Sequence, residues 1–397
     1  MSVEGLAALR TAKGEAALAA ASELPDGDPL AAASALRARG VDPPLAAAAL
    51  TQAGLRRRAA AKFGPAATRM FFTRVGLEQA TRAVVAERRA ARLAAAGVRT
   101  LADLGCGLGS DALAAARAGI RVYAVEADPL TAALAAANAE ALGLAGLVSV
   151  TVGDATAFDL AGVDAAFCDP ARRRPGTGRR VFDPDGYSPP WDFVAGLAAR
   201  VPRTVIKVAP GIDHGLIPPG AEAEWVSVDG DVVEAALWCG TLAETPRRAT
   251  LLSERAGRDG AAQLIGSPDA ALVGSVRRFL YDPDGAVVRA HLVAAFASTV
   301  DGVLADPTIA YVYADAHVPT PFARGLRVHD VLRFSLKRLR ALLRDRGVGR
   351  AEILKRGSAL DPHQLRQDLR LSGTGSVVLV LTRVAGAPTV LICEPVG

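Results

Sequence analysis

The sequence predicts an α/β fold: a mostly parallel sheet flanked by helices, preceded by a helical region and followed by a small α+β domain. Residues 1–95 are rich in Ala, Leu, Arg and Glu, with Pro or Gly breaks, which is typical of several helices. Between 99 and 239, short β-rich runs alternate with helical ones, as in parallel sheets. Helices and strands alternate again near the C-terminus. Because 397 residues exceed what one core usually serves, we expect several domains.

The expected domains follow these changes in pattern. They are a helical region (1–95), a sheet domain (96–240), a connecting region without clear assignment (241–322) and a C-terminal α+β domain (323–397). A helix over Leu77–Ala95 runs into the first strand and is placed to cover a site on the sheet.

Seven runs in the sheet domain are expected to be strands, at 100–104, 121–126, 148–152, 163–168, 204–208, 223–228 and 232–239. Asp229-Gly230 separates the last two, and this pair between strand-like runs is a hairpin signal, so the parallel sheet should finish with an antiparallel edge. In the C-terminal domain we expect helices at 332–346 and 362–370 and strands at 351–355, 377–384 and 389–393.

Composition excludes several classes of protein. No apolar stretch reaches the roughly 20 clean residues of a membrane span, and the first residues lack the pattern of a secretory signal. The four cysteines, without CxxC spacing, are expected to be reduced core residues, and the five histidines never approach metal-ligand spacing. We therefore expect a cytoplasmic protein without a metal.

A candidate cofactor site follows the first strand. Gly105, Gly107 and Gly109 allow a tight turn, and Asp103 stands two residues before them. This GxGxG spacing differs from the GxGxxG of dinucleotide sites and, with the preceding acid, favours a cationic amino-acid ligand over a diphosphate. Glu126, 21 residues after Gly105, is placed to accept hydrogen bonds from ribose hydroxyls, and Asp154 from an adenine amino group.

Each of these elements alone is weak evidence: the glycines also suit an ordinary strand-to-helix turn, and Glu126 or Asp154 alone is more simply a surface carboxylate or an N-cap. Together they occur in order at the carboxyl ends of successive strands, where ligands of open α/β sheets bind. The combination favours a Rossmann-like cofactor site.

With these motifs the chain resembles class I S-adenosylmethionine-dependent methyltransferases, specifically bacterial members with a THUMP-like C-terminal domain. The resemblance covers about residues 60–397 and depends on FFTR (71–74), LEQAT (77–81), DLGCGLGSD (103–111), DPARR (169–173), KVAPGI (207–212) and SLKRLRALL (335–343). It implies a Rossmann-like methyltransferase sheet, S-adenosylmethionine as cofactor, and methyl transfer to RNA.

The catalytic candidates are Asp169 and Pro170, which follow the fourth strand. In nitrogen methyltransferases the corresponding D/N-P-P-aromatic loop holds a planar amine by its carboxylate or amide. Arg172 stands where the aromatic is missing, so base stacking would need Phe182, Tyr187 or Trp191. The simpler interpretation is an aspartate that caps a turn before solvated arginines. We expect Arg172, Arg173, Tyr187 and Trp191 to contact substrate.

Asp-Pro followed by Arg is also similar to RNA pyrimidine C5-methyltransferases, which need a cysteine nucleophile after the fifth strand. Here that stretch begins with Lys207, a candidate phosphate contact, and has no cysteine, while Cys168 is expected in the core. A nitrogen acceptor is therefore favoured. Ser188, followed by two prolines, is expected to cap a helix at 191–200.

From Arg324 to Arg370 the chain has 13 Lys or Arg against 5 Asp or Glu, a local excess of 13 − 5 = 8. Lys337 and Arg338 lie on the expected helix within this basic segment and are expected to contact RNA phosphates. A solvated helix face explains the pattern too.

The leading hypothesis is a methyltransferase acting on a base nitrogen of tRNA or rRNA. The alternatives are a small-molecule methyltransferase and a non-catalytic protein that binds S-adenosylmethionine and RNA.

Overall fold

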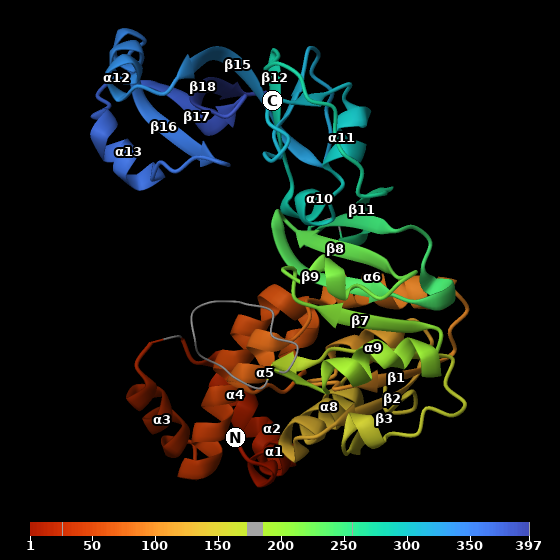
Figure 1. Ribbon diagram of the computed structural model, residues 1–397. Coiled ribbons are helices and arrows are strands. Elements are labelled where there is room, and N and C mark those ends of the chain that lie inside the picture. The colour runs from red at the N-terminus through yellow and green to blue at the C-terminus, as the bar shows by residue number, and fades with distance from the viewer. Residues whose placement is uncertain (26, 173–185, 256, 397) are drawn as a thin grey trace. The chain divides into compact units, whose positions relative to one another are not determined.

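The computed structural model describes residues 1–25, 27–172, 186–255 and 257–396 (Figure 1). The chain forms two compact units: Met1–Ala221 with Ala236–Glu244, and Glu222–Ala235 with Thr245–Gly397. None of the helices in the described ranges combines the length and apolar character needed to cross a bilayer.

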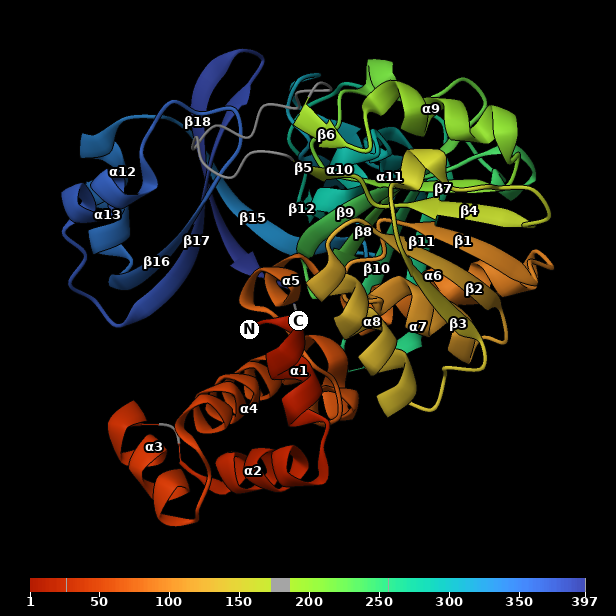
Figure 2. The same ribbon diagram turned by 90° about the horizontal axis from the view of Figure 1, so that it is seen from below.

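The first unit begins with the expected helices. They are α1 (Val3–Leu9), α2 (Ala12–Glu23), α3 (Pro29–Ala38), α4 (Pro43–Phe63), the 3-10 helix η1 (Gly64–Thr68), α5 (Arg74–Gln79) and α6 (Ala83–Ala95). Side chains of Ser2, Thr11 and Thr73 accept hydrogen bonds from the first turns of α1, α2 and α5, as N-caps do. The helices and the sheet share one hydrophobic core, to which Leu9, Phe72 and Leu101 belong. Figure 2 shows the ribbon of this helical region, in red to orange, beside the sheet.

The expected parallel strands are confirmed. They are β1 (Thr100–Leu104), β2 (Arg121–Glu126), β3 (Val148–Val152), β4 (Ala165–Cys168) and β7 (Thr204–Val208). All four neighbouring pairs among them are parallel, and Asp103 of β1 pairs in register with Ala124 and Phe167. The connecting helices are α7 (Ser110–Arg117), α8 (Pro129–Ala141) and α9 (Trp191–Arg200), and the carboxyl ends of the strands therefore meet at one edge.

The expected antiparallel hairpin forms, but it is not the end of the sheet. Strands β8 (Glu222–Val228) and β9 (Asp231–Trp238) are joined at Asp229 and Gly230, both of which have positive φ, as the tightest hairpin turns require. The nine strands follow the order β11-β10-β8-β9-β7-β4-β1-β2-β3. β10 (Arg247–Ser253) pairs with β8 in parallel, and β11 (Gly257–Gly266) with β10 antiparallel, so part of the unassigned region belongs to this sheet.

The second unit also contains a seven-stranded sheet of order β13-β14-β12-β15-β18-β17-β16. Its strands are β12 (Phe279–Pro283), β13 (Val303–Leu304), β14 (Val312–Ala314), β15 (Ala323–Arg333), β16 (Val348–Lys355), β17 (Gly375–Val384) and β18 (Ala387–Pro395). Its helices are α10 (Gly285–Arg289), α11 (Val293–Thr299), α12 (Leu336–Asp345) and α13 (Pro362–Leu369). The sheet crosses the expected domain boundary at 322/323, because β12–β14 come from the unassigned region.

The C-terminal helices and strands occur nearly as expected, with one correction. Residues 332 and 333 extend β15 instead of beginning the helix, since α12 starts only after its N-cap Ser335. Leu339 and Leu343 of α12 pack with Leu365 and Leu369 of α13 over β16–β18.

Candidate active site

A cavity of about 540 Å³ lies at the carboxyl ends of the parallel strands in the first unit. The predicted cofactor residues line it together: Asp103, Gly105, Gly107, Glu126 and Asp154. Asp169 lines the same cavity. Gly109, also predicted to bind the cofactor, does not line the cavity: it is the N-cap of α7, where a Cβ would lie 3.5 Å from the Cβ of Ala135.

The glycine-rich loop has the backbone that its sequence predicts. Gly105, Gly107 and Gly109 all have positive φ (87°, 55° and 84°), which side-chain-bearing residues rarely adopt. A Cβ on Gly105 would lie 3.5 Å from the carbonyl oxygen of Asp169, so the loop passes close to the backbone of the catalytic candidate.

Asp103 is fully buried, and neither carboxylate oxygen has a hydrogen-bond partner among the described residues. Burial, and next the charges of Asp111 and Asp169, raise the pKa of Asp103 well above its ordinary value. A buried carboxyl group without a partner is costly, and a cationic ligand would relieve that cost.

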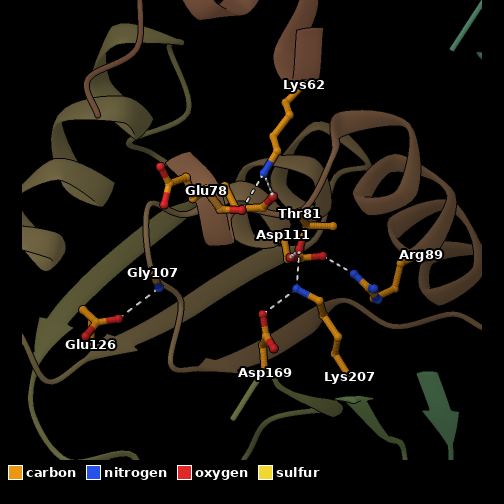
Figure 3. A network of polar contacts seen from close by, with 10 residues as sticks. Lys62, Glu78, Thr81, Arg89, Gly107, Asp111, Glu126, Asp169 and Lys207 are labelled. Atoms are coloured by element: carbon orange, nitrogen blue, oxygen red, sulfur yellow. Dashed lines mark hydrogen bonds and ion pairs between the residues drawn. The ribbon is translucent and has the colours of Figure 1, made fainter. Parts of the chain in front are cut away.

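Glu126 and Asp154 stand at the ends of the next two strands. The Glu126 carboxylate accepts a hydrogen bond from the backbone N–H of Gly107 at 3.0 Å (Figure 3), which fixes it beside the glycine-rich loop. It also accepts one from the backbone N–H of Asp128 at 3.0 Å. Asp154 is exposed and caps a short 3-10 helix, η2 (Ala155–Ala157), by accepting from Thr156 N–H at 2.8 Å. Each carboxylate retains acceptor capacity for a ligand, since it has about four lone-pair sites.

Asp169 forms an ion pair with Lys207, with 2.6 Å between Asp169 Oδ2 and Lys207 Nζ (Figure 3). The Asp169 side chain is 36% exposed and the Lys207 side chain only 14%. Lys207 was expected as a phosphate contact; its ammonium group instead lies in the cavity wall against the candidate acceptor-binding carboxylate. Pro170, the second catalytic candidate, is buried and does not line the cavity.

Behind this ion pair lies a buried polar network that sequence reasoning missed. Lys207 Nζ donates to Thr81 Oγ1 at 3.0 Å, and Thr81 Oγ1 donates to Asp111 Oδ2 at 2.7 Å. Arg89 contacts the other Asp111 oxygen, and its guanidinium lies 4.6 Å from the Phe167 ring centroid. The available signals were Asp111 in the first turn after the glycines and Thr81 in the LEQAT motif, neither of which indicates a partner.

Burial by itself raises the pKa of Asp111. The charges of Arg89 and Lys207 and the hydrogen bonds from Arg89 and Thr81 outweigh it, so the pKa of Asp111 is lowered. Asp111 is therefore ionised in the folded protein at neutral pH.

Part of the cavity wall comes from the helical region, between Thr73 and Thr81. The expected single helix over 77–95 is broken here, and α5 with the following turn lines the cavity in place of α6. Lys62 holds the turn by donating to the carbonyls of Leu77, Glu78 and Ala80 at 2.7–3.0 Å. Asn138 is fully buried. Its side chain accepts a hydrogen bond from Phe71 N–H and donates to the carbonyls of Phe71 and Leu108, which joins the segment preceding α5 to the glycine-rich loop.

The cavity fits a cationic nucleoside-containing ligand. Five carboxyl groups line it against one lysine among the described residues, and their positions suit an ammonium or sulfonium group, a ribose diol and an adenine amino group. In the described ranges there is no cluster of three His, Cys, Asp or Glu residues that could hold a metal ion.

The expected stacking residues are packed inside the protein. Tyr187 is 3% and Trp191 8% exposed, and their ring centroids lie 6.2 Å apart in a tilted arrangement. Their burial does not favour a stacking role. The backbone of Arg172 pairs with Tyr187 in a short ladder of β5 (Ala171–Arg172) with β6 (Tyr187–Ser188). Arg173 and Phe182 lie outside the described residues.

Ser188 has a different place from the one expected. Pro190, not Ser188, is the N-cap of α9, and Ser188 and Pro189 line the cavity instead. The bond between them is cis.

All four cysteines are buried and carry free thiols. Cys168 is fully buried on β4, and this burial, followed by the charges of Asp169 and Asp103, raises the pKa of its thiol far above the ordinary value. A thiol in this environment is a poor nucleophile.

On the second unit, Lys337 and Arg338 are exposed in the first turn of α12. Their side chains are available to a polyanion. The next residue, Leu339, is buried in the core of this domain.

Three family profiles match the chain. A methyltransferase domain matches residues 102–171, a THUMP domain-like family matches 323–395, and a domain of unknown function matches 2–59.

Relatives of known sequence or structure agree with these profiles. Uncharacterized S-adenosylmethionine-dependent methyltransferases from two strains of Mycobacterium tuberculosis are 37% identical to this chain over 363 residues, covering 86% of the chain and 95% of theirs. A crystal structure from Porphyromonas gingivalis W83, which carries a provisional methyltransferase name, has a TM-score of 0.70 at 20% identity, covering 98% of this chain and 96% of its own. This last likeness shows the fold.

Proposed function

This chain belongs to the S-adenosylmethionine-dependent methyltransferase family, and from that premise we propose that it methylates a base nitrogen of RNA, either tRNA or rRNA. The observation that carries the proposal is Asp169. This carboxylate lies at the end of β4, in the cavity that contains the cofactor residues, and is still partly exposed to it.

Each cavity residue has a part in this reaction. Asp103 would bind the positively charged amino-acid end of S-adenosylmethionine, Glu126 the ribose hydroxyls and Asp154 the adenine amino group. When bound, the cofactor would supply an electrophilic methyl group to the nitrogen lone pair, with S-adenosylhomocysteine as the leaving group, and the proton that the nitrogen loses would pass to solvent. Asp169 accepts a hydrogen bond from the N–H of the acceptor amine, which orients the nitrogen lone pair and stabilises the positive charge that grows on nitrogen during transfer.

The chemistry of the cavity favours nitrogen over carbon as the acceptor. Methylation at pyrimidine C5 needs a thiolate that adds to the ring. Among the described residues, Cys106 is the cysteine that lines the cavity, and burial, followed by the charges of Asp103 and Glu126, raises the pKa of its thiol well above the ordinary value. Neither Cys106 nor Cys168 is suited to that addition.

The C-terminal domain supports RNA as the substrate class. A THUMP domain-like family matches it, and THUMP domains suggest RNA binding. Its exposed Lys337 and Arg338 would neutralise phosphates, and they belong to a segment with a local excess of positive charge. We place the reaction in the cytoplasm, in keeping with the four buried free thiols.

The test is methyl transfer from labelled S-adenosylmethionine to total RNA from cells that lack the gene. Wild-type protein should label one size fraction, and Asp169→Ala, which removes the hydrogen-bond acceptor altogether, should lower that labelling by about 10²-fold or more while it still binds S-adenosylhomocysteine. Asp192→Ala, at an exposed acid on α9 outside the cavity lining, is the matched control and should label RNA normally.

The other outcomes point to the alternatives. Salt-insensitive methylation of a small molecule, without RNA retention, would favour a small-molecule methyltransferase. Cofactor binding without transfer to any pool would favour a non-catalytic protein.

A further inference from the structure

We propose that Lys207 and Thr81 are positioning residues for Asp169, so that the helical region takes part in forming the acceptor site. The proposal rests on the assignment of Asp169 above and adds two residues, one expected to contact phosphate and the other without an expected role. Its basis is a continuous chain of buried polar contacts that ends at Asp169 (Figure 3).

The chain of contacts has a fixed direction. Asp111 is ionised and accepts only, so the single Thr81 hydroxyl proton must be donated to Asp111 Oδ2. A Thr81 lone pair then faces Lys207, and Lys207 Nζ donates to it at 3.0 Å. The ammonium group is thereby held in one place, from which it also donates to Asp169 Oδ2 at 2.6 Å.

This arrangement divides the work of the two Asp169 oxygens. Lys207 binds Oδ2, and no described residue forms a hydrogen bond with Oδ1. A carboxylate held by one oxygen cannot turn freely, so the other oxygen is presented to the acceptor in a fixed direction.

The ion pair also offsets negative charge in a cavity that is lined by several carboxyl groups. Asp103, Asp111, Glu126 and Asp154 line the same cavity, so an unpaired Asp169 would add to a strongly negative site. Lys207 offsets this charge, and the hydrogen bond to Thr81 helps to keep its ammonium group beside Asp169.

The connection reaches into the helical region. Thr81 lies in the turn between α5 and α6, and Arg89 of α6 contacts Asp111 from the other side. Arg89 and Asp111 are both buried, with side chains 4% and 10% exposed. This anchor is rigid because burial leaves neither group an alternative partner in water.

The first experiment needs no acceptor. S-adenosylmethionine and S-adenosylhomocysteine differ by one methyl group and one positive charge, so the ratio of their dissociation constants, measured by calorimetry, reports the charge beside the reacting sulfur. In Lys207→Met the preference for the cationic ligand should rise about tenfold, because Asp169 is no longer neutralised.

Thr81→Val removes no charge and is the sharper variant. It should shift the preference in the same direction by about threefold, because the released ammonium group neutralises Asp169 less well. Thr81→Ser keeps the hydroxyl and should restore the wild-type ratio. The proposal is overturned if Thr81→Val gives the wild-type ratio, or if it weakens both ligands equally and Thr81→Ser does the same.

The second experiment measures methyl transfer to RNA at saturating cofactor. Lys207→Met should lower kcat by about 10²-fold and Thr81→Val by about tenfold, with little change in cofactor KM, and Thr81→Ser should recover most of the loss. An undiminished kcat in Lys207→Met would also overturn the proposal. If the wild-type protein labels no RNA, the proposed function fails, while the ligand ratios still decide the positioning role.

Discussion

Replacing Asp103 by Asn should change stability and cofactor binding in opposite directions. Asp103 is fully buried without a hydrogen-bond partner among the described residues, and burial, with the charges of Asp111 and Asp169, raises the pKa of Asp103 well above its ordinary value. The protein without ligand thus carries a group that is unfavourable to the fold and favourable to a cationic ligand. An amide has the same shape and does not ionise.

The stability effect depends on pH with a definite sign. An acid whose pKa is raised by folding ionises first in the unfolded state, so its contribution to stability falls as pH rises above the ordinary carboxyl range. The Asn variant has no such loss. Its advantage over wild type should be small near pH 4 and about 1–3 kcal/mol near pH 8, because the amide and the carboxyl share the cost of burial and differ by this ionisation linkage. For a unit of this size that corresponds to a rise of about 3–9 °C in Tm.

The binding effect has the opposite sign. A ligand ammonium favours ionised Asp103, so S-adenosylhomocysteine should bind with release of up to about one proton, and its affinity should rise with pH until the ligand amine itself deprotonates at alkaline pH. Asp103→Asn removes a charge-assisted hydrogen bond worth about 1.5–3 kcal/mol, so affinity should fall about 10- to 100-fold. Proton release should disappear as well.

Thermal unfolding at several pH values and calorimetry in two buffers of different ionisation enthalpy measure both effects. Asp192→Asn, exposed on α9, is the control and should leave both unchanged. A variant that loses stability and affinity together, or a wild-type protein that binds without proton release, would refute the reasoning, because Asp103 would then have an ordinary structural role.

Three further perturbations test separate parts of the structure. Asn138→Leu removes three buried hydrogen bonds of 2.7–3.2 Å and should lower the free energy of unfolding by about 2–4 kcal/mol, measured by thermal unfolding. Glu140→Ala on the same helix removes only an exposed ion pair and should cost under about 1 kcal/mol. Equal losses would contradict the role of Asn138 in joining the helical region to the glycine-rich loop. Cys168→Ala should retain methyl transfer, and a folded, cofactor-binding but inactive variant would restore the carbon mechanism. Lys337→Glu combined with Arg338→Glu should weaken RNA retention in filter binding. It should also reduce the slope of log affinity against log salt concentration by about 0.7 for each phosphate that the protein no longer neutralises. An unchanged slope would show that these residues of α12 do not contact RNA.

The sequence alone was sufficient to predict the parallel sheet and the convergence of the cofactor candidates Asp103, Glu126 and Asp154 at one edge of it. Periodicity and flanking turns predicted the strands, and each cofactor candidate stands at the end of one of them. Because parallel strands end at one edge of a sheet, Asp103, Glu126 and Asp154 had to converge there once their strands were assigned. The glycine spacing likewise predicted a loop with positive φ, since only glycine adopts it at low cost.

Burial was less accessible to sequence reasoning. Tyr187 and Trp191 were expected to stack on a base because of their residue type, yet both rings pack inside the protein. An aromatic side chain suits a core as well as a binding surface, and only its neighbours in three dimensions decide between them. The same holds for β10 and β11, whose strands became evident only through their pairing with β8 and with each other.

Only the tertiary structure revealed the polar network that surrounds Asp169. Lys207 is 38 residues from Asp169 and 126 residues from Thr81, and no local pattern relates a lysine at the end of one strand to a threonine between two helices. Strand order places Lys207 next to Asp169, and packing of the helical region against the sheet brings Thr81 and Arg89 to Asp111. The sequence could identify residues whose function follows from their position on one strand. It could not identify residues that depend on a partner, because such pairs are chosen by the folded chain and not by spacing along it.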